Sequence, residues 1–297
     1  MTSAGYQLRE RKSRFIQLLY SEPPPTVCPN FYTLAHANGC LFSPQCSYCY
    51  LKSSLGHLKA HEVFTNVDEM IKEIRHWIAR DDLHSYMLNA GTLSDSFTFE
   101  QVRPVVAALV ETFRQAAWGR PHTLLFLTKG GRRECKPLYD LEPCSNVVVS
   151  FSVTHLQAAQ RFEKGAATVE DRLNAAADLK ARGWRLRLRI DPMFRGYEYG
   201  DIAAQVKSLQ PERVTLGTLR ADHNLFRYVN DGLLDELEPP DDKKRPARYP
   251  LEVRLALYRQ AIEVLDGACP IALCEEEPVA WDALGLDKEA KPCNCCV

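Results

Sequence analysis

The chain has 297 residues, 45% of them hydrophobic, enough to bury the core of one large α/β domain or of a domain with a small appendix. No stretch approaches the roughly 18 apolar residues of a membrane span, so we expect a soluble, cytoplasmic protein. The formal net charge of −1 gives no overall attraction to nucleic acid. Eleven cysteines without a visible secretory leader favour reduced thiols that act as ligands over a disulfide framework.

Extended apolar runs alternate with helical ones along the chain. We expect strands over residues 31–35, 85–89, 122–128, 147–152, 184–191 and 214–216. Capping patterns and apolar stripes predict helices over residues 66–78, 98–113, 168–182 and 250–265. This alternation, with crossovers long enough for helices, predicts a parallel barrel or partial barrel. The chemistry of such a fold lies at the carboxyl ends of the strands.

Three cysteines stand close together just after the first expected strand, at Cys40, Cys46 and Cys49. Three thiolates at this spacing can hold three irons of a 4Fe-4S cluster and leave the fourth iron open to a small molecule. A radical S-adenosylmethionine (SAM) enzyme needs such an open iron. A structural zinc site is the alternative, and its fourth ligand would have to be His36, His57 or a distant cysteine.

Polar residues follow the expected strands at 89–95, 128–131 and 150–152, and Asp191 closes the next strand. The two-residue period of the strand over 184–191 puts Arg185, Arg187 and Arg189 on one face. If the opposite face meets the helices, these arginines point into the barrel and favour an anionic ligand such as a carboxylate or a phosphate. Pairing with interior carboxylates, or a place at the bottom rim, is the alternative.

In this order and spacing, the motifs make the chain resemble a radical SAM protein of the spore photoproduct lyase type, from roughly Tyr32 to Arg220. The resemblance rests on the motifs at 46–51, 55–56, 92–95, 128–129, 150–152, 162–165, 170–175 and 191–192. It implies an α/β fold with a partial (β/α)6-type TIM barrel over 31–235. An N-terminal segment over 1–30 precedes the barrel, and a C-terminal helix with a small cysteine-rich extension over 236–297 follows it.

The resemblance also implies the cofactors. Cys40, Cys46 and Cys49 would ligate a 4Fe-4S cluster, and SAM would chelate its open iron. Reduction by a donor such as flavodoxin or ferredoxin would then cleave SAM to a 5′-deoxyadenosyl radical that abstracts hydrogen from a substrate. The sequence does not identify that substrate, and the class expected is a lyase-like radical SAM enzyme.

Further residues are assigned by the same matching. The residues implied to hold SAM are Ser94, Lys129, Ser152 and Arg189. The tyrosines that match the family's radical relay are Tyr48 and Tyr50. Satisfied strand-end hydroxyls are the alternative for the serines, and packing beside the cluster is the alternative for the tyrosines.

The chain departs from the family pattern in two ways. The first gap between the cysteines holds five residues instead of three, which costs little in loop closure. The stretch over 90–95 has no thiol, whereas the repair enzyme has a cysteine there that returns hydrogen to the product radical. Repair of a DNA photoproduct and a nucleic-acid partner are therefore doubtful on the sequence.

Five cysteines lie between residues 269 and 296. The candidates for a second site, holding an auxiliary iron-sulfur cluster, a zinc or a thiophilic species such as arsenite, are Cys269, Cys274, Cys293 and Cys295. A reduced tail without a ligand is the alternative.

Two other functions stay open on the sequence. The barrel could be the scaffold of a non-catalytic iron-sulfur or zinc protein. Alternatively, the enzyme could break a different bond of SAM and transfer the aminocarboxypropyl group to a nucleophile, which would leave methylthioadenosine.

Overall fold

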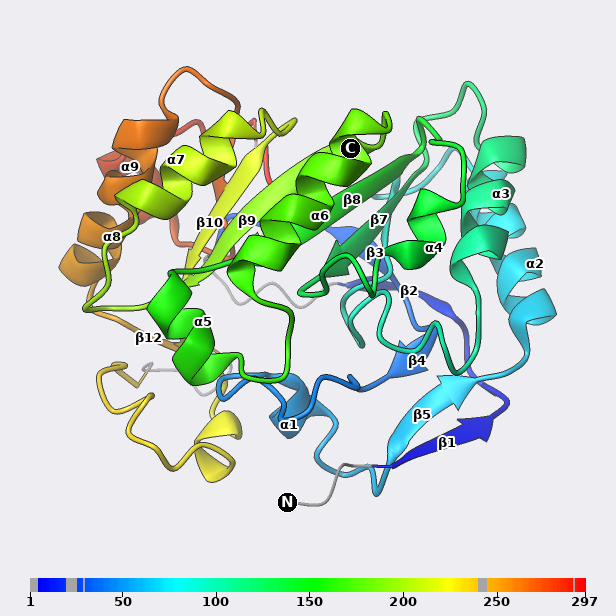
Figure 1. Cartoon of the computed structure of the whole chain (residues 1–297), viewed down its shortest axis with the longest axis horizontal. Coiled ribbons are helices and arrows are strands. Elements are labelled where there is room, and N and C mark those ends of the chain that lie inside the picture. The colour runs from blue at the N-terminus through cyan, green and yellow to red at the C-terminus, as the bar shows by residue number, and fades with distance from the viewer. Residues whose placement is uncertain (1–4, 20–25, 29, 240–244, 291) are drawn as a thin grey trace.

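The computed structural model describes residues 5–19, 26–28, 30–239, 245–290 and 292–297. Its centre is an eight-stranded sheet in the order β13-β10-β9-β8-β7-β6-β3-β2. The strands from β13 to β3 are parallel to their neighbours, and β2 at one edge runs antiparallel to β3. In the described chain the two edge strands do not pair with each other, so the sheet is an open, partial barrel (Figure 1).

The six predicted strands are confirmed, and two short ones join them at the edges. The strands are β2 (Ile16–Leu19), β3 (Phe31–Leu34), β6 (Met87–Asn89), β7 (Thr123–Thr128), β8 (Val147–Val153), β9 (Arg185–Met193), β10 (Val214–Thr218) and β13 (Ile271–Leu273). β2 and β13 come from the segments before residue 31 and after residue 235, so both segments contribute to the main sheet. The domain boundaries proposed from the sequence stay a prediction.

Helices cover the outer face of the sheet (Figure 1). The helices of the described chain are α1 (Leu51–Ser54), α2 (Val67–Ile78), α3 (Val106–Ala116), α4 (Lys136–Tyr139), α5 (Leu156–Phe162), α6 (Val169–Ala181), α7 (Gly200–Ser208), α8 (Leu251–Leu265) and α9 (Pro278–Ala283), with a 3-10 turn at Leu225–Arg227. Small sheets pair β1 (Tyr6–Arg9) and β4 (Ala37–Asn38) with β5 (His61–Phe64), and β11 (Arg220–Ala221) with β12 (Ala247–Arg248). Among the described residues, every helix is too short or too polar to cross a bilayer.

The starts of α6 and α3 differ in how well the sequence predicted them. α6 begins next to Thr168, where the helix was expected to start, and the Thr168 hydroxyl caps it by accepting a hydrogen bond from the backbone N–H of Asp171. The pattern beginning at Thr98 is misleading, since α3 begins only at Val106. There the Glu100 carboxylate accepts hydrogen bonds from the N–H groups of Val105 and Val106, doing the work of a cap from outside the helix.

The two faces of β8 and β9 meet different surroundings. Leu186, Leu188 and Ile190 belong to the main apolar core, together with residues of the outer helices. On the inner face, the side chains of Phe31, Met87, Leu125 and Val148 form a separate apolar cluster, and Cys295 of the C-terminal tail packs against it. The tail therefore fills part of the barrel interior.

Inward-facing arginines hold this tail in place. Arg187 is completely buried and donates hydrogen bonds to the carbonyls of Asn294 at 2.7 Å and Cys296 at 2.5 Å. Arg213 donates to the carbonyl of Cys293 at 3.2 Å. Arg185 and Arg187 both pair with Glu212, so neither contacts the open end of the barrel where an anionic ligand was expected. The alternative raised from the sequence, pairing near the bottom rim, is correct for these two.

We expect Arg187→Met to lower the free energy of unfolding by about 3 kcal/mol, because it leaves two buried carbonyls without their donor and removes a buried ion-pair partner. Arg185→Met, two residues away on the same strand but at the partly exposed rim, should cost below about 1 kcal/mol. Denaturant unfolding of the two variants measures the difference. Equal losses would show that the tail does not depend on Arg187.

Candidate functional site

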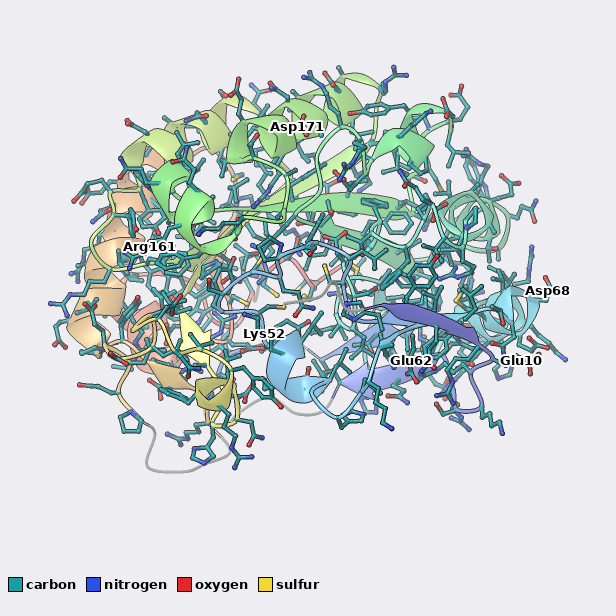
Figure 2. All side chains as sticks on the ribbon, turned by 60° about the horizontal axis from the view of Figure 1, so that its bottom comes forward. Glu10, Lys52, Glu62, Asp68, Arg161 and Asp171 are labelled. Atoms are coloured by element: carbon teal, nitrogen blue, oxygen red, sulfur yellow. The ribbon has the colours of Figure 1, made fainter. Side chains whose placement is uncertain are left out.

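The three N-terminal cysteines lie on one loop, over residues 39–50, at the carboxyl end of the parallel strands. Gly39 begins it with a φ of 111°, a conformation that glycine favours, and donates its N–H to the carbonyl of Leu93 at 2.8 Å. Further along, the N–H of Ser47 donates to the carbonyl of Phe162 at 2.8 Å. Figure 2 brings this end forward, with Lys52 of α1 between Arg161 and Glu62. The loop is thus held from two sides.

The five-residue gap between Cys40 and Cys46 is accommodated because it packs against a glycine, Gly165. Cys40 and Cys46 are buried and Cys49 is half-buried. A Cβ atom on Gly165 would lie 2.2 Å from the carbonyl oxygen of Pro44, so only glycine allows the extended loop to approach this closely. This contact gives the 162–165 motif a structural role, since it supports the cysteine loop.

The ligands of a cluster and those of a single metal ion differ in spacing. Within the described residues, no three His, Cys, Asp or Glu side chains are grouped as the ligands of one metal ion. A 4Fe-4S cluster takes each thiolate on a different iron, so its ligands stand further apart. Two buried atoms at the neighbouring strand ends, Thr92 Oγ1 and Arg189 Nε, have no partner in the described chain, as expected of groups that contact a polar ligand.

A buried carboxylate ties the loop to the barrel. The Glu163 side chain is fully buried, lies 2.9 Å from Lys129 Nζ and 2.6 Å from Arg172 Nη1, and accepts a hydrogen bond from the Tyr48 hydroxyl. Burial alone would raise the pKa of Glu163, but the charges of Arg172 and Lys129 lower it to about 2. Glu163 is therefore a permanent anion at physiological pH, and it fixes Tyr48 and Lys129.

Lys129 follows β7 and faces several groups at once. Besides Glu163, its ammonium donates to the carbonyl of Asp191 at 3.3 Å and lies 5.6 Å from the ring centroid of Tyr48. Below it, the Asp95 carboxylate accepts hydrogen bonds from the backbone N–H of Lys129 and the hydroxyl of Thr128. Burial raises the pKa of Asp95 to about 6 despite these hydrogen bonds.

A buried histidine, His36, orients the hydroxyl group of Ser94 through a hydrogen bond. The hydroxyl oxygen of Ser94 is 2.8 Å from Nε2 of His36, which is also 3.1 Å from the carbonyl of Ala90. Burial, reinforced by the charge of Arg103, lowers the pKa of His36 to about 3, so the ring is neutral. Because a carbonyl only accepts, we assign the ring proton to Nε2, with Nδ1 facing Arg103. The Ser94 hydroxyl then accepts from His36 and keeps its own proton to donate.

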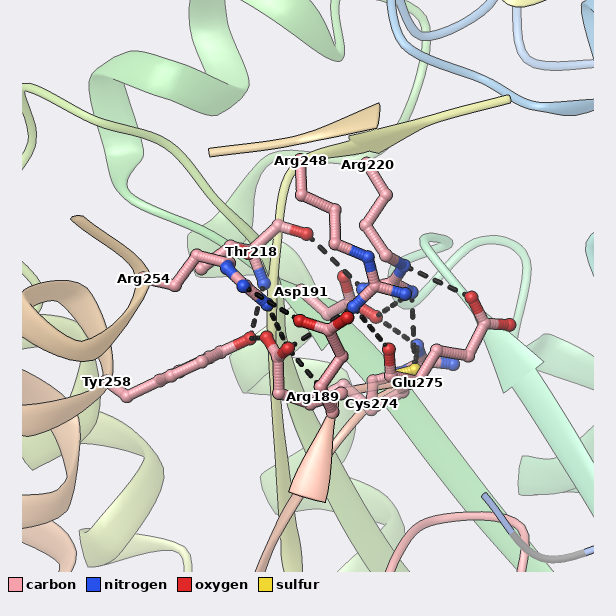
Figure 3. Close-up of polar contacts among 11 residues, drawn as sticks. Arg189, Asp191, Thr218, Arg220, Arg248, Arg254, Tyr258, Cys274 and Glu275 are labelled. Carbon is pink, nitrogen blue, oxygen red and sulfur yellow. Dashed lines mark hydrogen bonds and ion pairs between the residues drawn. The ribbon is translucent and has the colours of Figure 1, made fainter. Parts of the chain in front are cut away.

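Arg189 belongs to a cluster of charges around Asp191 (Figure 3). Asp191 pairs with Arg189 and lies 3.7 Å from Arg220. Burial would raise the pKa of Asp191, but these two cations lower it to about 2. Both arginines also donate to the sulfur of Cys274, at 3.2 and 3.3 Å. A Cβ on Gly217 would lie 2.7 Å from the Asp191 carboxyl, so this close packing requires glycine.

The other residues predicted for the site are Ser152, Tyr48 and Tyr50, and each has a neighbour in the site. Ser152 pairs in register with Arg189 across β8 and β9. Tyr50 donates to the carbonyl of Thr92 and is 47% exposed. Both tyrosines are part of the cysteine loop, and Lys129 contacts this loop through the ring of Tyr48.

The C-terminal cysteines are not gathered into one site. Cys269 lies two residues before the start of β13 and Cys274 directly follows its end, so the two are separated by the strand. Cys274 lies among the arginines near Asp191, whereas Cys293 and Cys295 lie in the tail held by Arg187 and Arg213. The structure thus gives no support to one auxiliary cluster or zinc bound by all four.

Comparison with known proteins agrees with this geometry. The family model described as spore photoproduct lyase matches residues 25–215, well over half of the chain. The chain belongs to the spore photoproduct lyase family. The sequence-based resemblance is therefore confirmed at the level of the family.

Individual relatives are more distant. The spore photoproduct lyase of Geobacillus sp. (strain Y412MC61) is 26% identical over 171 residues, and that of Bacillus subtilis (strain 168) is 23% identical over the same length. Both alignments cover 57% of this chain and 48% of the relative, so the chain spans about half the length of the curated relatives it matches.

Solved structures show the same fold over a longer range. A spore photoproduct lyase complexed with dinucleoside spore photoproduct superposes with a TM-score of 0.72 at 19% identity. A variant with bound AdoMet and the same dinucleoside has a TM-score of 0.71 at 17% identity. Each likeness covers 92% of this chain and 82% of the other.

Sequence reasoning missed several residues of the site. Glu163 and Arg172 lie in motifs that carried the resemblance, but nothing in the sequence assigns them a partner. Arg220 and the position of Cys274 depend on β10 and β13 lying side by side. The segment around Glu163 gives no local signal, because Arg161 and Lys164 beside it are charged as well.

The charge of Glu163 should appear in the pH dependence of stability. Because its folded pKa is about 2 and its ordinary value is 4.5, its contribution is complete above pH 4.5 and is lost as the pH falls toward 2. We expect Glu163→Gln to lower the free energy of unfolding by about 3 kcal/mol at pH 7 and by much less near pH 3. Denaturant unfolding of the wild type and the variant at both pH values measures the two losses of unfolding free energy.

The exposed Glu170 on α6 provides the matched control. Glu170→Gln should leave the free energy of unfolding nearly unchanged at both pH values, because that carboxylate lies in solvent. A Glu163→Gln variant with the same stability loss at pH 3 as at pH 7 would contradict the buried-anion assignment.

Proposed function

We propose that this chain holds a 4Fe-4S cluster through Cys40, Cys46 and Cys49 and cleaves SAM reductively. The observation that supports this most is the place of the cysteine loop. It packs against Phe162 and Gly165 and, through Tyr48, contacts the charged groups at the strand ends. When bound, the cluster supplies the electron that breaks a carbon-sulfur bond of SAM and yields a 5′-deoxyadenosyl radical.

The residues that would hold SAM come from neighbouring strands. Lys129 and Arg189 offer positive charge to the methionine carboxylate, and both are kept in position by carboxylates of the protein. Ser94 offers a hydroxyl proton to the ribose or carboxylate, because its oxygen already accepts from His36. Ser152, next to Arg189 in register, lies in the same part of the barrel.

Aromatic rings would shield this place from water. Tyr48 packs edge-on against Phe194 with centroids 5.4 Å apart, and Phe194 stacks on Phe162 at 4.8 Å. Glu163 accepts a hydrogen bond from the Tyr48 hydroxyl, so the ring cannot swing away without breaking a hydrogen bond to this buried carboxylate. A dry, fixed wall is what a reactive radical requires, because water exclusion prevents side reactions.

The cluster is tested by replacing its ligands one at a time. We expect Cys40→Ser, Cys46→Ser and Cys49→Ser each to lower bound iron and acid-labile sulfide and to abolish 5′-deoxyadenosine release from SAM under dithionite. The matched control is Cys144→Ser, since Cys144 is also buried but packs in the main core. Unchanged iron content in all three variants would contradict the proposal.

The nucleoside product separates the other functions left open. Methylthioadenosine would indicate transfer of the aminocarboxypropyl group, and protein that binds iron or zinc without consuming SAM would be non-catalytic. Flavodoxin or ferredoxin as the physiological reductant stays a prediction, which replacement of dithionite by either protein would test.

Photoproduct repair is a second candidate for this site. It is favoured by the fold shared with the relative complexed with dinucleoside spore photoproduct. Residues 90–95 carry no thiol, but Cys274 lies across the site beside Arg189 and Arg220. A repair reaction in this chain would therefore draw its hydrogen atom from Cys274. The resulting thiyl radical would return to the thiol by taking one electron from the donor that reduces the cluster and one proton from solvent.

The dinucleoside spore photoproduct is the probe for repair. With SAM and dithionite, we expect the wild type to release the repaired dinucleoside, and Cys274→Ala to lose at least about tenfold of this product while still forming 5′-deoxyadenosine. Cys28→Ala, outside this cluster, should behave like the wild type. No repaired product from the wild type would exclude repair of this lesion without touching SAM cleavage.

A further inference from the structure

Two thiols of the C-terminal tail lie in contact. The sulfur atoms of Cys293 and Cys296 are 3.6 Å apart, and the N–H of Cys296 donates to the carbonyl of Cys293 at 3.1 Å, which closes a turn between them. A disulfide has a sulfur–sulfur distance of about 2.05 Å, so a shift of about 1.5 Å would join the two atoms. The spacing, two residues between the cysteines, is that of redox-active dithiols.

Two arginines hold this turn in place by hydrogen bonds to its backbone oxygens. Arg187 donates to the carbonyl of Cys296, and Arg213 donates to the carbonyls of Cys293 and Val297. Arg187 is completely buried, and its Nη2 atom has no hydrogen-bond partner in the described chain. Positive charge next to a thiol favours the thiolate, which is the form that attacks a disulfide.

The two thiols differ in access, and both are remote from the cluster loop. Cys293 is buried and Cys296 is half-buried. Cys295, between them in the sequence, is also hydrogen-bonded to Cys293, packs on the inner apolar cluster and accepts a weak hydrogen bond from Asn89 at 3.8 Å. Figure 1 shows the C-terminus at the end of the sheet opposite to α1, so this pair does not belong to the 4Fe-4S site.

We propose that Cys293 and Cys296 form a redox-active dithiol that exchanges with external disulfides. The Cys296 thiolate attacks a sulfur of the external disulfide, forms a mixed disulfide and releases the first thiol. Cys293 then attacks the Cys296 sulfur, loses its proton and releases the second thiol. The protein dithiol is oxidised by two electrons, and the external disulfide takes up those electrons together with two protons.

The test uses the full-length protein and does not depend on SAM cleavage. The reduced chain is equilibrated with glutathione disulfide, quenched with an alkylating reagent and digested. We expect the peptide containing residues 293–296 to lose its alkylation at Cys293 and Cys296 and to carry an internal disulfide, which dithiothreitol reverses. Both cysteines alkylated after this treatment, or Cys295 found in the disulfide, would overturn the proposal.

Single variants assign the two roles. Cys293→Ser should trap one glutathione on Cys296, because the second attack cannot occur, whereas Cys296→Ser should abolish the internal disulfide and take up glutathione slowly. Cys295→Ser is the matched control in the same turn and should keep the internal disulfide. If a variant does not fold, the peptide map of the wild type still decides the pairing.

Discussion

The buried carboxylate of Glu163 is the interaction on which the site depends. It ends α5, and its partners come from the cysteine loop, from the end of β7 and from α6, through Tyr48, Lys129 and Arg172. A charge taken out of water is stable only when its partners are all in place, and removal of one leaves an uncompensated ion. The four elements must therefore assemble together, which places the cysteine loop against the strand ends.

Much of the fold could be predicted because its signals are local. Buried strands such as β7 and β8 read as continuous apolar runs, and α6 shows both its cap and its terminal glycine. β2 and β13 lie outside the run of alternating strands and helices seen in the sequence, and each pairs with only one neighbouring strand, at an edge of the sheet. The alternation in β9 correctly predicted that Arg187 faces inward. The tail carbonyls to which Arg187 donates could not be predicted, because they lie over one hundred residues away in the sequence.

In the candidate site too, some residues could be predicted from local motifs, whereas others depend on tertiary contacts. The cysteines and Lys129 were found from their motifs, because their spacing along the chain carries the information. The donor role of Ser94 follows only from the neutral His36 behind it, which in turn depends on burial and on Arg103. The cluster of Arg189, Asp191 and Arg220 needs β9 and β10 in register, and a sequence without that register shows only scattered charges.

The hydrogen-bond capacity left at the strand ends indicates what ligand the site can take. Lys129 has three N–H donors, and the described residues use two of them, toward Glu163 and Asp191. Arg189 keeps its Nε hydrogen, and Ser94 keeps its hydroxyl proton. All three remaining groups are donors, held on rigid elements by carboxylates or by His36. A ligand that satisfies them must present acceptor oxygens, as the carboxylate and ribose of SAM do, whereas a purely cationic or apolar ligand would leave them unpaired at a cost.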